Sequence, residues 1–115
     1  MPSDRFTGEE PGAWITQIPE SVRTRRLIER DLSRIAQILG SDWEVVASEL
    51  GLTKVELDHC KMENHTVTMQ VYAALYKWRN RVANGATLDA IVRILTECQC
   101  TTIDWSQLER VARNM

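Results

Sequence analysis

The chain has 115 residues, a length typical of one domain, and sixteen acidic against fourteen basic residues give it a net charge of −2. Its composition, 43% hydrophobic and 26% charged, is that of an ordinary globular protein. The near-neutral charge argues against a general binder of nucleic acids or anionic membranes, because such proteins are usually basic.

The N-terminus and the cysteines indicate a cytoplasmic protein. Three cysteines, Cys60, Cys98 and Cys100, are too few and too odd in number for a disulfide scaffold, and they indicate free thiols in a reducing compartment. Residues 1–10 contain no apolar signal-peptide core. No apolar run approaches the roughly 20 residues that a transmembrane helix requires. We therefore expect a cytoplasmic location and no membrane span.

Residues 1–21 differ from the rest of the chain. They hold all three prolines and two of the five glycines, and their apolar residues have no helical period. This pattern predicts a flexible N-terminal tail or linker, followed by one folded domain over residues 22–115. Trp14, Ile15 and Ile18 are unusually apolar for a solvated tail, so we expect them to dock on the domain or on a partner.

From Val22 onward, apolar residues recur with the spacing of amphipathic helices. The pattern predicts five clear helices and a weaker sixth, over residues 28–39, 43–50, 53–63, 66–82, 87–95 and 104–112. The expected N-terminal caps are Ser41 or Asp42, Thr53, Thr66 or Thr68, Thr87 and Asp104.

Glycines mark most of the expected helix ends, and Thr53 with Glu56 forms a capping box. Gly40 and Gly51 are expected stops, and Asn84-Gly85 is expected to form a turn. Residues 98–102 read as a loop. Because the connections are short and no strand pattern occurs, the sequence predicts an all-α bundle of six helices around one core.

The sequence contains no combination of residues that predicts catalysis. His59 and Cys60 are adjacent, so on a helix they point about 100° apart and do not form a catalytic pair. The residues His59, His65, Cys98 and Cys100 lack the spacing of a zinc site. A glycine-rich phosphate loop is also missing. We therefore expect no enzymatic activity, no metal or other cofactor and no small-molecule substrate.

Charged residues are segregated along the chain. Residues 23–34 sum to +3, residues 77–81 add another +3, and residues 42–63 sum to −4. Such runs are often no more than solvated helix faces. Opposite charges on separate faces of one bundle would, however, be complementary to a second copy or to a homologous domain. Head-to-tail contacts of this kind build rings or filaments rather than closed dimers.

Residues 43–61 have a second interpretation. The sequence WEVVASELGLTKVELDHCK places a glycine turn between two short helices, as in a helix-turn-helix DNA-binding domain. Its second helix is acidic, with Glu56, Asp58 and Glu63 against Lys54 and Lys61. A helix that meets phosphates should be basic, so we keep DNA binding only as an alternative and expect no nucleic-acid partner.

Several motifs in order resemble the death domain family. They are LSRIAQILGSDWEVVASELGLTKVEL (residues 32–57), VYAALYKWRNRV (residues 71–82) and GATLDAIVRIL (residues 85–95). The following stretch, ILTECQCTTIDWSQLERV, is most similar to the adaptor class typified by the Fas-associated death-domain protein. The resemblance covers about 80 residues, and the order of the motifs is more specific than any one of them.

This resemblance implies a six-helix antiparallel Greek-key bundle without enzymatic activity, which assembles with other death domains in apoptotic or innate-immune signalling. It also implies asymmetric contacts, in which a surface of helices one and four meets a surface of helices two and three. On the first, basic surface lie Arg30, Arg34, Lys77, Arg79 and Arg81. On the second, acidic surface lie Asp42, Glu44, Glu49, Glu56, Asp58 and Glu63. A death domain cut from a larger signalling enzyme, such as a kinase, is the remaining alternative.

Overall fold

The computed structural model describes residues 12–40, 42–98 and 103–115. Six main helices follow the expected order in these ranges, and shorter elements precede and connect them. The main helices are α2 (Glu29–Ala36), α3 (Trp43–Glu49), α4 (Lys54–Glu63), α5 (Val67–Val82), α6 (Leu88–Cys98) and α7 (Trp105–Arg113). The shorter elements are the 3-10 helix η2 (Ala13–Gln17), the single-turn helix α1 (Glu20–Arg23) and the 3-10 turn η3 (Ala83–Gly85).

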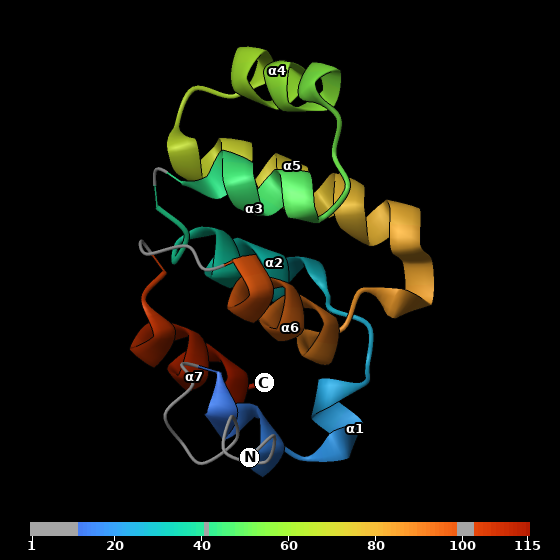
Figure 1. Cartoon of the computed structure of the whole chain (residues 1–115), viewed down its shortest axis with the longest axis vertical. Helices are drawn as coiled ribbons and strands as arrows, with labels where there is room; N and C mark the ends of the chain where they lie inside the picture. Colours follow the sequence, from blue (N-terminus) through green and yellow to red (C-terminus); the bar gives the residue numbers. More distant parts are fainter. Residues whose placement is uncertain (1–11, 41, 99–102) are drawn as a thin grey trace.

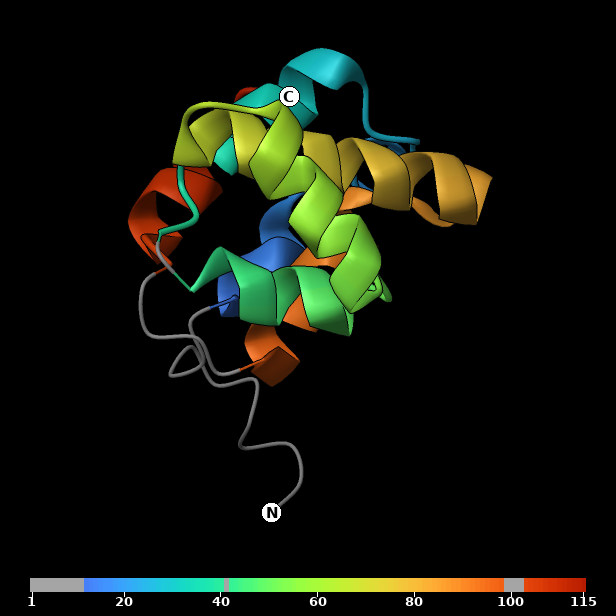
Figure 2. The ribbon, with the colours of Figure 1, turned by 90° about the horizontal axis from the view of Figure 1, so that it is seen from above.

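The helices stack along the long axis of the molecule, with α4 at one end and α1, η2 and α7 at the other (Figure 1). Helix α5 lies in the middle of one half, packed against both α2 and α4. Figure 2, viewed from the α4 end, shows α4 running over α3 and α5. Helix α6 packs against α3 and α1, and α7 packs against α2. This arrangement is the expected all-α bundle.

Local hydrogen bonds explain where most helices begin. The hydroxyl oxygens of Thr53, Thr66 and Thr87 each accept a bond from the backbone N–H three residues later, at 3.1–3.2 Å. The Asp104 carboxylate does the same for α7 at 3.1 Å. The expected capping box is complete, because Thr53 N–H also donates to Glu56 Oε1 at 2.9 Å. Asp42 occupies the N-cap position of α3 without a side-chain bond, and Ser41 lies outside the described residues.

Gly51 ends α3 in the way that the sequence predicts. Its φ of +99° reverses the chain, a conformation that costs other residues free energy because of their Cβ atoms. The N–H groups of Gly51 and Leu52 then donate to Ser48 and Ala47 carbonyls at 3.0 and 3.1 Å, which satisfies the end of the helix. The resulting tight turn sets α4 across α3 and brings its capping box close to α5.

The first predicted helix is shorter than expected. Helix α2 ends at Ala36, whereas the apolar pattern runs on to Leu39. Ile38 N–H donates to Ile35 O at 3.0 Å, so the last turn tightens and the regular helix stops. Ile38 and Leu39 remain buried beyond the helix end. Periodicity therefore identified the core residues correctly but overran the helix.

The described part of the N-terminal segment forms short helical elements that pack on the bundle. Residues 12–21 include η2 and the start of α1, and Trp14 and Ile18 are buried in the core cluster of the bundle. The expected docking of these apolar side chains is confirmed, with the domain itself as their binding surface. Aperiodic spacing did not predict these short elements, because tertiary contacts hold them in place. Residues 1–11 of the predicted tail lie outside the described residues.

One continuous apolar core joins the six main helices and the N-terminal segment. Its largest fully buried side chains come from the connection before α2 and from six helices: Leu27, Leu32, Ile35, Val46, Cys60, Val71, Leu75, Leu88, Ile91, Leu95 and Leu108. Trp43 and Trp78 are also buried, at 4% and 3% exposure. Within the described ranges, we find no helix with the length and apolarity needed to cross a membrane.

Candidate functional site

Two arginines project from the outer side of α2. Arg30 and Arg34 are one helical turn apart and exposed, while Leu32 and Ile35 on the opposite side are buried. Neither guanidinium has an ion-pair partner within the described residues. These two positive charges are therefore available to a partner.

The three expected basic residues of α5 do not share one face. Arg79 is partly buried, and its Nε donates to Leu27 O at 2.6 Å, on the α2 side. Arg81 lies on the other side, where Nη1 donates to Gly51 O at 2.8 Å and Nη2 pairs with Glu56. Lys77 is half-buried, and its charge acts on Cys60 of α4. The basic residues predicted as one surface are thus split between two sides of α5.

The acidic residues of α3 and α4 fall into two groups. Three of them have a basic neighbour: Glu44 pairs with Lys61 at 3.3 Å, Asp58 with Lys54 at 3.9 Å, and Glu56 with Arg81. The other three have no ion-pair partner among the described residues, and they are Asp42, Glu49 and Glu63. Glu49 and Glu63 are exposed, and Asp42 is half-buried. Part of the predicted acidic surface is therefore neutralised within the molecule.

The Glu56 carboxylate connects the start of α4 to α5. The backbone hydrogen bond from Thr53 lowers its pKa, and the hydrogen bond and positive charge of Arg81 lower it further. Glu56 is therefore ionised at neutral pH. The same carboxylate caps α4 and pairs with α5, so it joins two helices in addition to presenting a charge.

Cys60, the residue beside His59, is unsuited to catalysis. Its side chain is fully buried in the core, and this burial raises the pKa of the thiol. The reactive thiolate is therefore disfavoured. No group of three or more His, Cys, Asp or Glu side chains that could hold a metal ion occurs in the part of the chain that the structure describes, which leaves out Cys100.

Exposed apolar side chains accompany both charged regions, and the helical pattern did not single them out. Val45, Val55 and Met62 are 52%, 61% and 79% exposed on α3 and α4. On α5, Met69 lines a shallow groove with Tyr72, whose ring stacks on that of Tyr76 with centroids 6.1 Å apart. The groove reaches Arg30 of α2. The sequence does contain a signal for these exposed apolar residues. Their spacing places them away from the buried face of each helix.

The family comparison agrees with this architecture. Residues 29–108 match the Death domain family, which covers more than half of the chain. The chain therefore belongs to the death domain family. Death domains are generally protein-interaction modules that bind other death-domain proteins, and they are generally not enzymes. The matched range begins at the first residue of α2 and ends within α7.

Proposed function

We propose that this protein is a cytoplasmic, non-enzymatic adaptor that assembles with other death domains in apoptotic or innate-immune signalling. Its contacts are asymmetric, between a basic surface and an acidic surface. The basic surface is centred on Arg30 and Arg34 of α2. The acidic surface is centred on Asp42, Glu49 and Glu63 of α3 and α4.

The observation that supports this proposal most is the presence of unpaired charges of opposite sign on different helices of one bundle. Arg34 and Glu49 are both exposed and have no ion-pair partner among the described residues. Charges of this kind steer encounter and fix register, whereas each exposed pair contributes only about 0.2–1 kcal/mol to affinity. Several contacts must therefore add up for a stable assembly.

The apolar side chains beside these charges could form the core of each interface. Interfaces generally combine an apolar core with a polar rim. Val55 and Met62 lie beside the acidic residues of α4, and the groove with Met69 and Tyr72 lies beside Arg30. Each proposed surface thus has an apolar part that a partner can cover and a charged part that selects the partner.

Arg79 and Arg81 have a different proposed role from Arg34. Their guanidinium groups bind backbone carbonyls within the molecule, at Leu27 and Gly51. We assign them to holding the helices in place, and we assign direct partner contact to Arg30 and Arg34. Substitution of Arg79 or Arg81 should therefore lower stability, whereas substitution of Arg34 should leave stability unchanged.

Charge reversal tests the proposal. Arg34→Glu and Glu49→Lys should each weaken association, by about 2- to 30-fold if the reversal turns one pair from attraction to repulsion. Arg34→Glu keeps the acidic surface intact, and Glu49→Lys keeps the basic surface intact. A mixture of the two variants should therefore associate through these two intact surfaces. Arg93→Glu is the matched control, since Arg93 is exposed on α6, a helix that contributes to neither proposed surface.

Analytical ultracentrifugation at low salt measures association, and circular dichroism verifies that each variant is folded. The proposal is wrong if both reversed variants associate like the unaltered protein, or if Arg93→Glu weakens association as much as they do. A mixture that associates no better than either variant alone would contradict the asymmetric contact.

A further inference from the structure

The segment of residues 12–23, here called the N-terminal strap, lies outside the region that matches the death domain family. It consists of η2, the connecting residues Ile18 and Pro19, and α1. In Figure 1 the strap lies beside α7 and below α6, at the opposite end of the molecule from α4. Trp14 and Ile18 anchor it, at 9% and 4% exposure.

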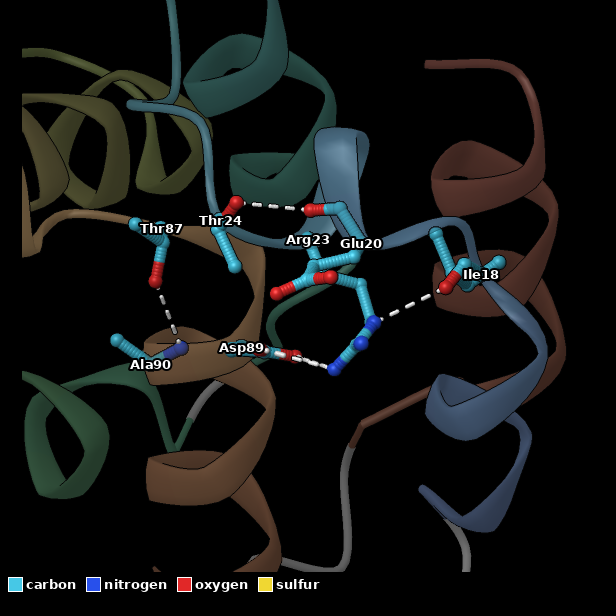
Figure 3. Close-up of polar contacts among 7 residues, drawn as sticks. All are labelled: Ile18, Glu20, Arg23, Thr24, Thr87, Asp89 and Ala90. Carbon is cyan, nitrogen blue, oxygen red and sulfur yellow. Dashed lines mark hydrogen bonds and ion pairs between the residues drawn. The ribbon is translucent and has the colours of Figure 1, made fainter.

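Polar contacts at the edge of the bundle hold the strap in place. Arg23 Nε donates to Ile18 O at 2.9 Å, and its Nη1 donates to the two Asp89 carboxylate oxygens of α6 at 3.1 and 3.4 Å (Figure 3). At the other side, Arg113 Nη2 of α7 donates to Gln17 Oε1 at 2.7 Å. The Arg23 and Asp89 side chains are 28% and 37% exposed, so water and ions compete with the ion pair between them.

The strap is closely packed at Gly12 but leaves a buried donor at Trp14 unpaired among the residues that the structure describes. The Trp14 Nε1–H is buried and has no hydrogen-bond acceptor within the described residues, which is unfavourable for a buried donor. Gly12 packs so closely that a Cβ atom would lie 3.0 Å from both Val92 Cγ1 and Thr96 Oγ1. Neither η2 nor α1 exceeds five residues, and such short helices are unstable without tertiary contacts.

We propose that the N-terminal strap is a releasable cover, which detaches while the six-helix bundle stays folded and thereby exposes the apolar surface of α6 and α7. Single-turn helices and a partly exposed ion pair are typical of segments that open locally. Release would uncover Val92 of α6 and Trp105 of α7, which lie beside Gly12. The uncovered surface lies on other helices than the charged surfaces of α2, α3 and α4.

Native-state hydrogen exchange tests this proposal directly. The amides of Val22, Arg23 and Thr24 donate to carbonyls within the strap at 3.0 Å, so they exchange when it opens. They should exchange faster than core amides of α5 such as that of Leu75. Arg23→Gln should accelerate the strap amides about three- to tenfold and leave the α5 amides unchanged. Arg93→Gln is the matched control, because it removes an exposed positive charge one turn from Asp89 without breaking the Arg23–Asp89 pair.

A second variant opens the strap without altering its charges. Gly12→Ala introduces the crowded Cβ atom and should accelerate exchange of the same strap amides, whereas Gly85→Ala, whose Cβ would meet nothing closer than 3.8 Å, should not. The proposal is refuted if strap and α5 amides exchange at one common rate in the unaltered protein. It is equally refuted if Arg23→Gln or Gly12→Ala accelerates the α5 amides as much as those of the strap.

Discussion

Replacing Ala83 with glycine should stabilise the protein. Ala83 follows the last residue of α5 with φ of 52° and ψ of −118°, a conformation in which its Cβ atom crowds the backbone. Such strain costs about 1–3 kcal/mol, and glycine removes it. Glycine also adds about 0.5–1 kcal/mol of conformational entropy cost on folding. The net gain expected for Ala83→Gly is therefore about 0.5–2 kcal/mol.

Thermal unfolding followed by circular dichroism measures this gain. An unfolding entropy of about 2.1 cal/mol/K per residue corresponds to roughly 0.24 kcal/mol/K for this chain, so Tm should rise by about 2–8 °C. Gly85→Ala, two residues further on, is the control, because Gly85 has an ordinary φ and space for a Cβ atom. Its Tm should stay within a few degrees of the parent. A lower Tm for Ala83→Gly would refute the assignment of strain to this residue.

Three further substitutions or titrations test the core and the helix caps. Trp78→Ala should lower the unfolding free energy by about 3–5 kcal/mol in urea titrations, because the side chain is 3% exposed; an unchanged midpoint would contradict its place in the core. The buried Asp31 carboxylate accepts a hydrogen bond from Ile28 N–H at 3.0 Å at the start of α2. Asp31→Ala removes this bond and should cost about 0.5–2 kcal/mol by the same assay, whereas loss of an exposed carboxylate would cost almost nothing. The pKa of Glu56 should lie below its ordinary value in an NMR titration, because of the Thr53 backbone bond and Arg81. Its stabilising contribution should accordingly be complete above the ordinary pKa and be lost as pH falls through the lowered one; Glu56→Gln should remove that acid dependence.

Local sequence signals were sufficient to predict the helices. Caps such as Thr53 and stops such as Gly51 act within a few residues, so the order and approximate bounds of all six main helices could be read from the chain. The short N-terminal elements could not, because Trp14 and Ile18 are held by burial in the shared core rather than by periodicity. The same limit applies to Ala83, since the Asn84-Gly85 pair indicated the turn but not which residue carries the positive φ.

The charged surfaces could be predicted only in outline. Runs of like charge in the sequence indicated which helices are basic and which are acidic. The pairing of Arg81 with Glu56 joins residues 25 positions apart and depends on how α4 crosses α5, so no local pattern reveals it. Arg79 likewise looked like a surface charge, but its guanidinium binds the Leu27 carbonyl. Arg34 and Glu49 remain the clearest candidates for partner contacts because both are exposed and unpaired within the described residues.

Light scattering on a size-exclusion column, at about 50 and 500 mM salt, tests charge-driven assembly most directly, because screening of exposed charges strengthens over this range. The proposed head-to-tail contacts predict species larger than a monomer at low salt that fall to the 13.2 kDa monomer at high salt. A monomer at both salt concentrations, or large species that persist unchanged at high salt, would contradict self-assembly of this chain through the charged surfaces of α2, α3 and α4.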